Sequence, residues 1–406
     1  MQKTKLRVGD KVIKLLDERE LLGRFLTIQG SRPDLIPKFK ETTGECEMSV
    51  VPRSICGVDG SLYIPGDKVS LMHAIEEATN EPTESVSPVH IVPSGHLSRV
   101  LIIDTMAVLQ SMKKTPTMLT VSNLQTSFIK CLESMATGYN EARVVFDNYL
   151  DMSLKNKTRQ KRAVSSTEFA IHPDMRLTMS LKDLLSSTRS KRSLTEMFAE
   201  ALLETSVISF NLFVVYGTKI KGRDFEQDHS HEEADTLLPH QVLASVDESK
   251  RQEICVWSPD PDVLTLLLDL VSHGRLGSHS ICSLKLLTGK GVKYREIDVV
   301  DRVKVIGHGK SQGLIGLRNF SGADWDGKFV GITKKTWVTE YLKIPDDDPV
   351  ITCFRELGNS HVAMELIGKE LPEKLRLLEH FVCHVYRRTG PTTLPPLNQS
   401  INQSWL

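Results

Sequence analysis

From Arg99 onward the chain alternates short apolar runs with segments of helical periodicity, and this alternation restricts the folds it can adopt. Five apolar runs, each short enough for a buried strand, occupy residues 100–104, 143–147, 209–217, 253–258 and 281–287. Helical segments lie between them, and in the first of these Leu124, Phe128 and Leu132 fall on one stripe. Strands that alternate with helices predict an α/β fold with a mainly parallel sheet and helices on both faces.

This α/β part leaves room for other regions at both ends. We expect an N-terminal region of unassigned role (1–97), the α/β domain (98–300), a helical element (301–345), and C-terminal helices with a tail (346–406). Residues 81–95 hold three prolines and few large apolar side chains, as a linker does. Residues 283–297, with the turn sequence TGKG, predict an antiparallel hairpin at an edge of the sheet.

Acidic residues follow the predicted strands or begin the helices beside them. They are Asp104, Asp147, Glu233, Asp235, Asp260, Asp262 and Asp324. Open parallel sheets place their sites outside the carboxyl ends of the strands. Carboxylates gathered there would repel one another and raise each other's pKa unless a cation neutralised them. The series therefore indicates a divalent-metal site of hard oxygen ligands, suited to Mg²⁺ or Mn²⁺.

Helix capping offers a second explanation for some of these acids. Asp260 and Asp262 lie two residues apart in SPDPD, and aspartate is favoured at a helix start. Glu233 and Asp235 suit the first helical turn through the helix dipole. Taken alone, each pair is explained better by a helix start than by a metal. The acids that end the first two apolar runs differ, because a carboxylate buried there is costly unless it is paired or metal-bound.

The amino-acid composition limits which binding partners and which cellular compartment we expect for this protein. The 51 Lys+Arg residues balance 51 Asp+Glu, so the net charge does not indicate a nucleic-acid partner and local charge must carry that argument. Seven cysteines without a CxxC pair favour reduced thiols inside the cell. No apolar stretch approaches the ~20 residues of a spanning helix, and the first residues lack a signal-peptide pattern. We expect a soluble intracellular protein, nuclear or cytoplasmic, with no membrane partner.

The ordered motifs resemble the flap-endonuclease (XPG-like) branch of the PIN-like nucleases, the structure-specific 5′ nucleases. VLIIDTMAVL and RVVFDN resemble the first two strands of that family, EEADT its EAEA motif, and SPDPDVLTL its paired-aspartate segment. NFSGADWDGKFVGITKKTWV resembles its helix-turn-helix motif, although Trp325 stands for a tyrosine and Thr333 for a glycine. The likeness spans roughly residues 99–342. It implies a PIN-like domain followed by a helical DNA-binding element.

The resemblance also implies a function for the acidic series. The seven acids would hold two Mg²⁺ or Mn²⁺ ions, directly or through water, for in-line displacement at a phosphodiester. We expect a structure-specific DNA nuclease without assigned protein partners. Two alternatives stay open, namely a nuclease-like protein that binds nucleic acid without cleaving it, and a PIN-type ribonuclease acting on RNA.

Two basic segments complete the family pattern. A basic arch at about 152–192 would orient the scissile phosphate, and its matching candidates are Lys155, Lys157, Arg159 and Arg162. In the helix-turn-helix element, Gly327 and Gly331 permit tight turns that expose N–H groups to a phosphate. Lys334 and Lys335 would add charge there. A solvated helical face and a turn with glycine caps are the plainer explanations of these two segments.

One histidine pair is left over from this pattern. His229 and His231 flank the acidic motif in DHSHEEAD and offer imidazoles to a transition metal. Loop histidines are more often solvated, and no cysteine lies nearby in the sequence.

Overall fold

The computed structural model describes residues 5–8, 11–14, 63, 69–79, 97–149, 169–205, 210–231, 234–276, 281–289, 293–323, 328–357 and 373–387. The chain forms two compact units. The α/β unit comprises Ile75–Ile315 and Phe354–Glu356. The helical unit comprises Met1–Ala74, Gly316–Cys353 and Leu357–Leu406.

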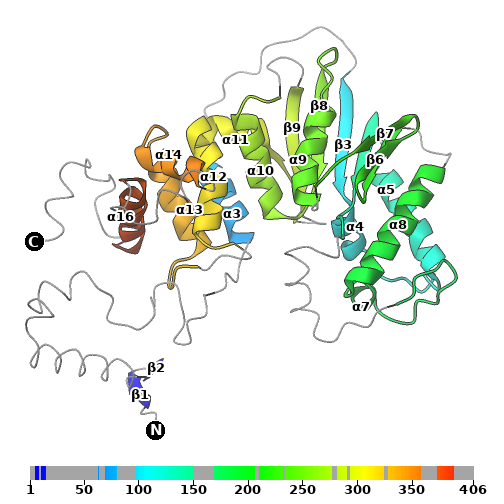
Figure 1. Ribbon diagram of the computed structural model, residues 1–406, viewed down its shortest axis with the longest axis horizontal. Coiled ribbons are helices and arrows are strands. Elements are labelled where there is room, and N and C mark those ends of the chain that lie inside the picture. The colour runs from blue at the N-terminus through cyan, green and yellow to red at the C-terminus, as the bar shows by residue number, and fades with distance from the viewer. Residues whose placement is uncertain are drawn as a thin grey trace, which may run out of the picture. The chain divides into compact units, whose positions relative to one another are not determined.

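An eight-stranded sheet in the order β10-β9-β8-β3-β4-β5-β6-β7 forms the centre of the α/β unit (Figure 1). Its strands are β3 (Ser98–Asp104), β4 (Glu141–Val145), β5 (Asn211–Tyr216), β6 (Lys219–Gly222), β7 (Phe225–Asp228), β8 (Gln252–Trp257), β9 (Ile281–Thr288) and β10 (Arg295–Asp298). The five strands from β9 to β5 run parallel, and antiparallel strands extend the sheet at both edges. The predicted α/β class with a mainly parallel sheet is confirmed. The predicted edge hairpin is also confirmed, because β9 and β10 pair antiparallel.

The strand order reverses beside β3, in the middle of the sheet. The chain first builds β4 and β5 on one side of β3 and later returns to place β8 and β9 on the other. In open α/β sheets, ligands bind at such a reversal, outside the carboxyl ends of the strands. Asp104 is in register with Val145 of β4, and Ile103 is in register with Trp257 of β8. The three central strands therefore end at the same level.

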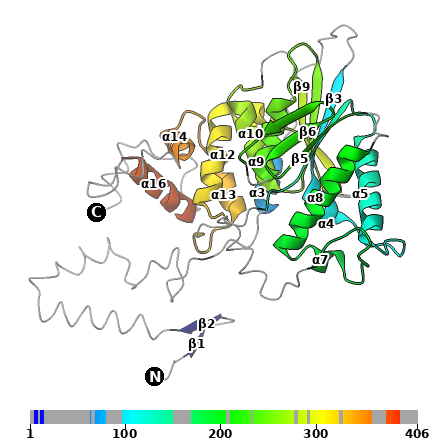
Figure 2. The ribbon, with the colours of Figure 1, turned by 45° about the vertical axis from the view of Figure 1, so that its right-hand side comes forward.

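Helices cover both faces of this sheet, and the two views agree on their placement (Figures 1 and 2). On one face lie α5 (Val121–Ala136) and α8 (Thr188–Glu204). On the other face α9 (Ala234–Ala244) contacts β3, β4 and β8, and α10 (Pro261–Ser272) packs beside α9. Helices on both faces are what alternating parallel strands require, since each crossover returns across a face.

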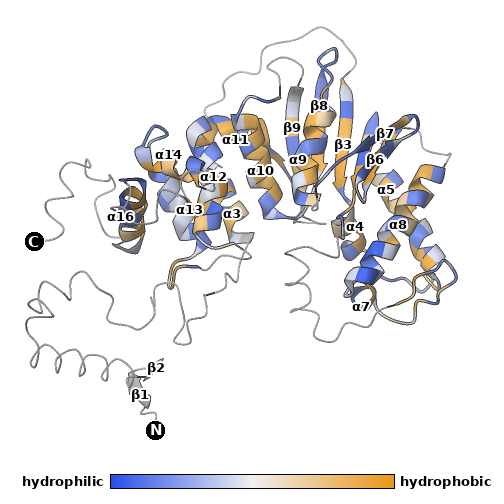
Figure 3. Cartoon of the chain, viewed as in Figure 1, coloured by the Kyte–Doolittle hydropathy of each residue, from blue (hydrophilic) through white to orange (hydrophobic). Residues whose placement is uncertain are grey.

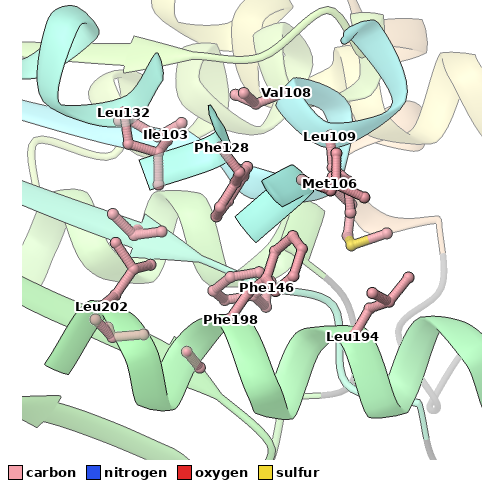
Figure 4. Close-up of a cluster of buried hydrophobic side chains, with 14 of the residues drawn as sticks. Ile103, Met106, Val108, Leu109, Phe128, Leu132, Phe146, Leu194, Phe198 and Leu202 are labelled. Carbon is pink, nitrogen blue, oxygen red and sulfur yellow. The ribbon is translucent and has the colours of Figure 1, made fainter. Parts of the chain in front are cut away.

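The core between the sheet and the α5/α8 layer is apolar and rich in phenylalanine (Figure 4). Phe128 of α5 lies 5.1 Å from Phe198 of α8 and 6.2 Å from Phe146, measured between ring centroids. Ile103 of β3 joins this cluster, and Leu124 and Leu132 of the predicted helical stripe are buried in it. The stripe therefore faces the sheet, and packing at this density holds β3 and β4 firmly in place.

Two strands at one end of the sheet, β6 and the edge strand β7, are absent from the sequence prediction. Their sequences, KIKG and FEQD, are short and polar, and all four residues of β7 are exposed. Figure 3 shows the contrast between these hydrophilic strands and the apolar β3. Gly217, with φ of 58°, adopts the left-handed conformation that the tight turn after β5 needs. Hydrophobic periodicity misses such strands because they are short and bury little, with Ile220 of β6 buried and no residue of β7 buried.

The helical unit is described by itself. Trp337 of α13 (Lys334–Lys343) is buried, and its ring centroid lies 5.9 Å from Phe320, 5.3 Å from Phe329 and 5.7 Å from Phe381 of α16 (Glu373–Arg387). Aromatic contacts of this kind contribute beyond their buried area. α13 and α16 therefore form the core of this unit among the residues described.

The remaining elements are β1 (Lys5–Val8), β2 (Lys11–Lys14), α3 (Val69–Thr79), α4 (Thr105–Ser111), α7 (Leu181–Leu184), α11 (Val299–Ile306), α12 (His308–Phe320) and α14 (Pro349–Glu356). Within the α/β unit, Glu76 of α3 forms an ion pair with Arg295 of β10 at 2.6 Å.

The domain boundaries given above stay predictions. None of the described helices has the length and apolar character that crossing a membrane needs.

Candidate metal centre

The ends of the central strands bring several of the predicted acids to one edge of the sheet. Asp104 is the last residue of β3, and Asp147 follows the last residue of β4 by two positions. Asp260 follows the last residue of β8 by three positions and caps α10. Asp235 lies in the first turn of α9. The strand reversal beside β3 is therefore lined by carboxylates.

Three of these carboxylates converge. Asp235, Asp260 and Asp262 each offer an oxygen, and these three atoms lie within 4.8 Å of one another. Asp235 and Asp260 are partly exposed. Oxygen-only donor sets of this kind suit Mg²⁺ or Mn²⁺ better than softer metals. Among the described residues, this is the group of acids arranged to share one cation.

Capping and clustering occur together at the start of α10. The Oδ1 atom of Asp260 accepts a hydrogen bond from the backbone N–H of Asp262 at 2.9 Å, and Pro261 occupies the first turn. This cap fixes the Asp260 side chain at the strand end, while Asp262 is carried by the first helical turn. The two explanations of SPDPD that the sequence left open are therefore compatible, because the cap positions the cluster.

Asp104 is the most buried of these carboxylates, with a relative exposure of 7%. Its pKa is raised to about 6, chiefly by burial and also by the neighbouring carboxylates of Asp147 and Asp260. Opposing this, its Oδ1 accepts from the N–H of Ala107 at 3.1 Å and its Oδ2 from the hydroxyl of Ser258 at 3.0 Å. The charge on Asp104 is thus costly in the protein alone, and a bound cation would offset that cost.

Asp147 joins the end of β4 to the start of α9. Its Oδ1 accepts from the N–H of Ala234 at 3.0 Å, and its Oδ2 accepts from the hydroxyl of Tyr149 at 3.3 Å. A carboxylate at a helix N-terminus is favoured by the free N–H groups and the helix dipole. The bond to Ala234 also holds the adjacent Asp235 near the strand ends.

Ser258, the first residue of SPDPD, is a site residue that the sequence motif does not single out. It is fully buried, and its Oγ donates to Asp104 and accepts from the backbone N–H of Asp260 at 3.2 Å. This hydroxyl therefore links the acid that ends β3 to the acid that caps α10. The signal available in the sequence was a small polar residue directly between a buried strand and the acidic pair.

Replacing Ser258 by alanine is expected to lower the free energy of unfolding by about 1–2 kcal/mol, because Asp104 loses a buried donor. We also expect metal-dependent turnover to fall about 10- to 100-fold, the usual effect of removing a group that orients metal ligands. Urea unfolding and single-turnover cleavage measure the two effects. Ser272→Ala is the matched control, since Ser272 is a buried serine that bonds to the backbone of Asp269. Equal turnover in Ser258→Ala and wild type would contradict the assigned role.

Several predicted site residues lie outside the described residues. They are Glu233, Asp324, Lys155, Lys157, Arg159, Arg162 and Gly327. Their roles stay predictions.

The other predicted nucleic-acid contacts lie in the helical unit. Gly331 has φ of 76°, in the left-handed region that the proposed tight turn requires. Lys334 and Lys335 begin α13, after the N-cap Thr333. The ammonium group of Lys334 donates to the carbonyl of Arg318 at 2.5 Å and to the hydroxyl of Ser321 at 2.9 Å. Lys334 thus joins the start of α13 to the end of α12, and Lys335 is the exposed lysine of the pair.

Comparisons with known proteins find distant structural similarity only. No protein-family profile and no curated protein matches the chain. Two solved structures of the bacteriophage T5 D15 flap endonuclease are similar to it. One is a variant in a pseudo-enzyme–product complex with DNA and metal ions, with 16% identity and a TM-score of 0.34 over 71% of this chain and 86% of that chain. The other is the D15 protein co-crystallised with metal ions, with 15% identity and a TM-score of 0.32 over 71% and 87%.

Proposed function

We propose that this chain is a metal-dependent nuclease that hydrolyses phosphodiester bonds in structured DNA. The observation that carries the proposal is the convergence of Asp235, Asp260 and Asp262 within 4.8 Å at the strand reversal of a mainly parallel sheet. A protein gains nothing in stability from gathering like charges, so such a cluster supports a cation-binding role.

The donor set fits Mg²⁺ or Mn²⁺. The converging atoms are carboxylate oxygens, and the raised pKa of Asp104 arises partly from neighbouring carboxylates that a cation would neutralise. Asp235, Asp260 and Asp262 would hold metal, and Asp104 and Asp147 would complete the set directly or through water. A pair of divalent ions supplies an activated water and stabilises the departing oxygen.

The protein's own residues would fix that site before substrate arrives. Ser258 holds Asp104 against the capped Asp260, and the N–H of Ala234 holds Asp147. Positioned oxygens need no reorganisation when the metal and the phosphate bind, which is how preorganised sites lower a barrier.

The basic segments supply the proposed grip on the nucleic acid. Within the described part of the basic stretch, Arg192 donates to the carbonyl of Tyr149, whose hydroxyl donates to Asp147. The start of α8 is therefore anchored to the segment that carries a candidate ligand. Lys155, Lys157, Arg159 and Arg162, which precede it in the chain, are proposed to orient the scissile phosphate. Gly327, Gly331, Lys334 and Lys335 are proposed to grip the duplex through its phosphates.

The test is cleavage by the purified full chain of 5′-flap, hairpin and single-stranded DNA, each paired with an RNA of the same sequence. We expect turnover with Mg²⁺ or Mn²⁺, none with EDTA, and a preference for the flap or hairpin DNA. Preference for RNA would replace the DNA assignment with a ribonuclease. Salt-sensitive DNA binding without metal-dependent turnover would overturn the enzymatic proposal.

A further inference from the structure

Three imidazoles gather beside the carboxylate centre but outside it. His229 and His231 follow the last residue of β7, and His240 lies on α9. The ring centroids of His229 and His231 are 6.2 Å apart, and those of His231 and His240 are 5.2 Å apart. The fold thus adds a third histidine, from a helix, to the loop pair that the sequence displays.

His229 is the unusual member of this group. Both of its ring nitrogens are shielded from solvent, and neither has a hydrogen-bond partner among the described residues. A shielded imidazole normally satisfies both nitrogens, because an unpaired polar atom costs free energy. No hydrogen bond within the described fold therefore explains why His229 turns its ring inward beside His231.

The rings are suited to act as neutral ligands. Burial lowers the pKa of His229 and of His240, and the neighbouring imidazoles lower both further. Imidazole nitrogen favours Zn²⁺, Cu²⁺ or Ni²⁺ over Mg²⁺, which prefers oxygen.

One of the imidazole pairs has the spacing that a tetrahedral ion requires. Two imidazoles bound through Zn–N bonds of about 2.0–2.1 Å have ring centroids about 5 Å apart. The His231–His240 pair meets this distance. The His229–His231 pair, at 6.2 Å, is wider, and the three rings do not yet offer one nitrogen each within 4.8 Å of one another, so binding requires His229 to reorient. Nδ1 of His231 lies 3.3 Å from the hydroxyl of Thr236, an arrangement that orients a ligating ring. The hydrogen bond between Nε2 of Gln241 and Nδ1 of His240 is long, at 3.4 Å, so a metal ion can displace it.

We propose that His229, His231 and His240 form a second metal site, for a borderline divalent transition ion such as Zn²⁺, separate from the oxygen-ligand centre. The ion would tie the end of the β6–β7 hairpin to α9, whose first turn carries Asp235. Because a metal that bridges two elements stabilises the folded state, the site would act as a structural clamp. This inference does not depend on the nuclease proposal.

The experiment titrates chelator-treated full chain with ZnCl₂ or CoCl₂ in excess MgCl₂, by calorimetry and by the visible absorption of bound Co²⁺. We expect one Zn²⁺ equivalent, a Co²⁺ spectrum typical of tetrahedral nitrogen ligation, and a raised melting temperature. His231→Ala/His240→Ala should weaken Zn²⁺ binding at least tenfold and remove the Co²⁺ bands. His172→Ala, which removes an exposed histidine elsewhere, is the matched control and should bind as wild type does.

Asp260→Asn/Asp262→Asn separates the two centres, and it should retain the Zn²⁺ equivalent and the Co²⁺ bands. Loss of that equivalent in the aspartate variant, or unchanged binding in the histidine variant, would overturn the proposal. Should the double histidine variant fail to fold by circular dichroism, His240→Gln alone replaces one partly exposed ligand on α9 and decides the question in the same way.

Discussion

Asp260→Asn/Asp262→Asn is expected to abolish metal-dependent cleavage while leaving the fold intact. The pair supplies two of the three converging carboxylates, so the double change removes two charges from the cation site. If the metals contribute on the order of 4 kcal/mol to the transition state, turnover falls about 10³-fold. Asparagine is as good an N-cap as aspartate, so α10 keeps its start and the melting temperature changes little.

The measurement is single-turnover cleavage of flap DNA at saturating Mn²⁺, with Mn²⁺ affinity measured in parallel. Asp301→Asn is the matched control, because Asp301 is an exposed acid in the first turn of α11, paired with Lys304 rather than with other carboxylates. Full activity in the double variant would remove Asp260 and Asp262 from the centre. A loss of DNA affinity with unchanged Mn²⁺ affinity would point instead to a role in substrate binding.

The pair Asp260 and Asp262 also shows what cannot be distinguished from the sequence alone. A helix cap and a metal ligand use the same residue type at the same place. The motif SPDPD alone therefore favours the helix cap, which is the more common role. What distinguishes them is whether a third carboxylate arrives from another element. Asp235 does so from α9, about 25 residues earlier in the chain, and only the parallel order of β4, β3 and β8 brings the two helix starts together.

The fold class could be predicted from local sequence patterns because buried parallel strands are apolar throughout. The burial of polar side chains could not be predicted in this way. Arg143 lies inside β4 with 6% exposure, and its guanidinium bonds to Glu141 at 2.6 Å and to Gln241 at 2.9 Å, and lies over the ring of Phe213. Gln241 and Phe213 come from other parts of the chain, whereas Glu141 lies two residues away in the same strand. No periodicity in the strand itself predicts that such a charge is satisfied.

Asp104→Asn is expected to make the metal-free protein more stable and the enzyme nearly inactive. The pKa of Asp104 is raised from 3.8 to about 6, so the folded state disfavours its charged form. The carboxyl group of Asp104 therefore contributes to the stability of the folded state below about pH 4. This contribution is lost as the pH rises through about 6. A shift of about two pKa units corresponds to about 3 kcal/mol, so in EDTA at pH 7.5 we expect the variant to be about 2 kcal/mol more stable than wild type.

Urea unfolding at pH 4.5 and pH 7.5, with EDTA or with Mg²⁺, tests this expectation. The difference between variant and wild type should be small at pH 4.5, grow at pH 7.5, and shrink again with Mg²⁺, because metal binding stabilises wild type alone. Asp104→Ala is the control that also removes the bond to Ala107 and so loses the cap of α4. A variant less stable than wild type in EDTA at pH 7.5 would mean that Asp104 is held for structure. A more stable and inactive variant would mean that the protein keeps a costly charge at the strand end because its function requires one there.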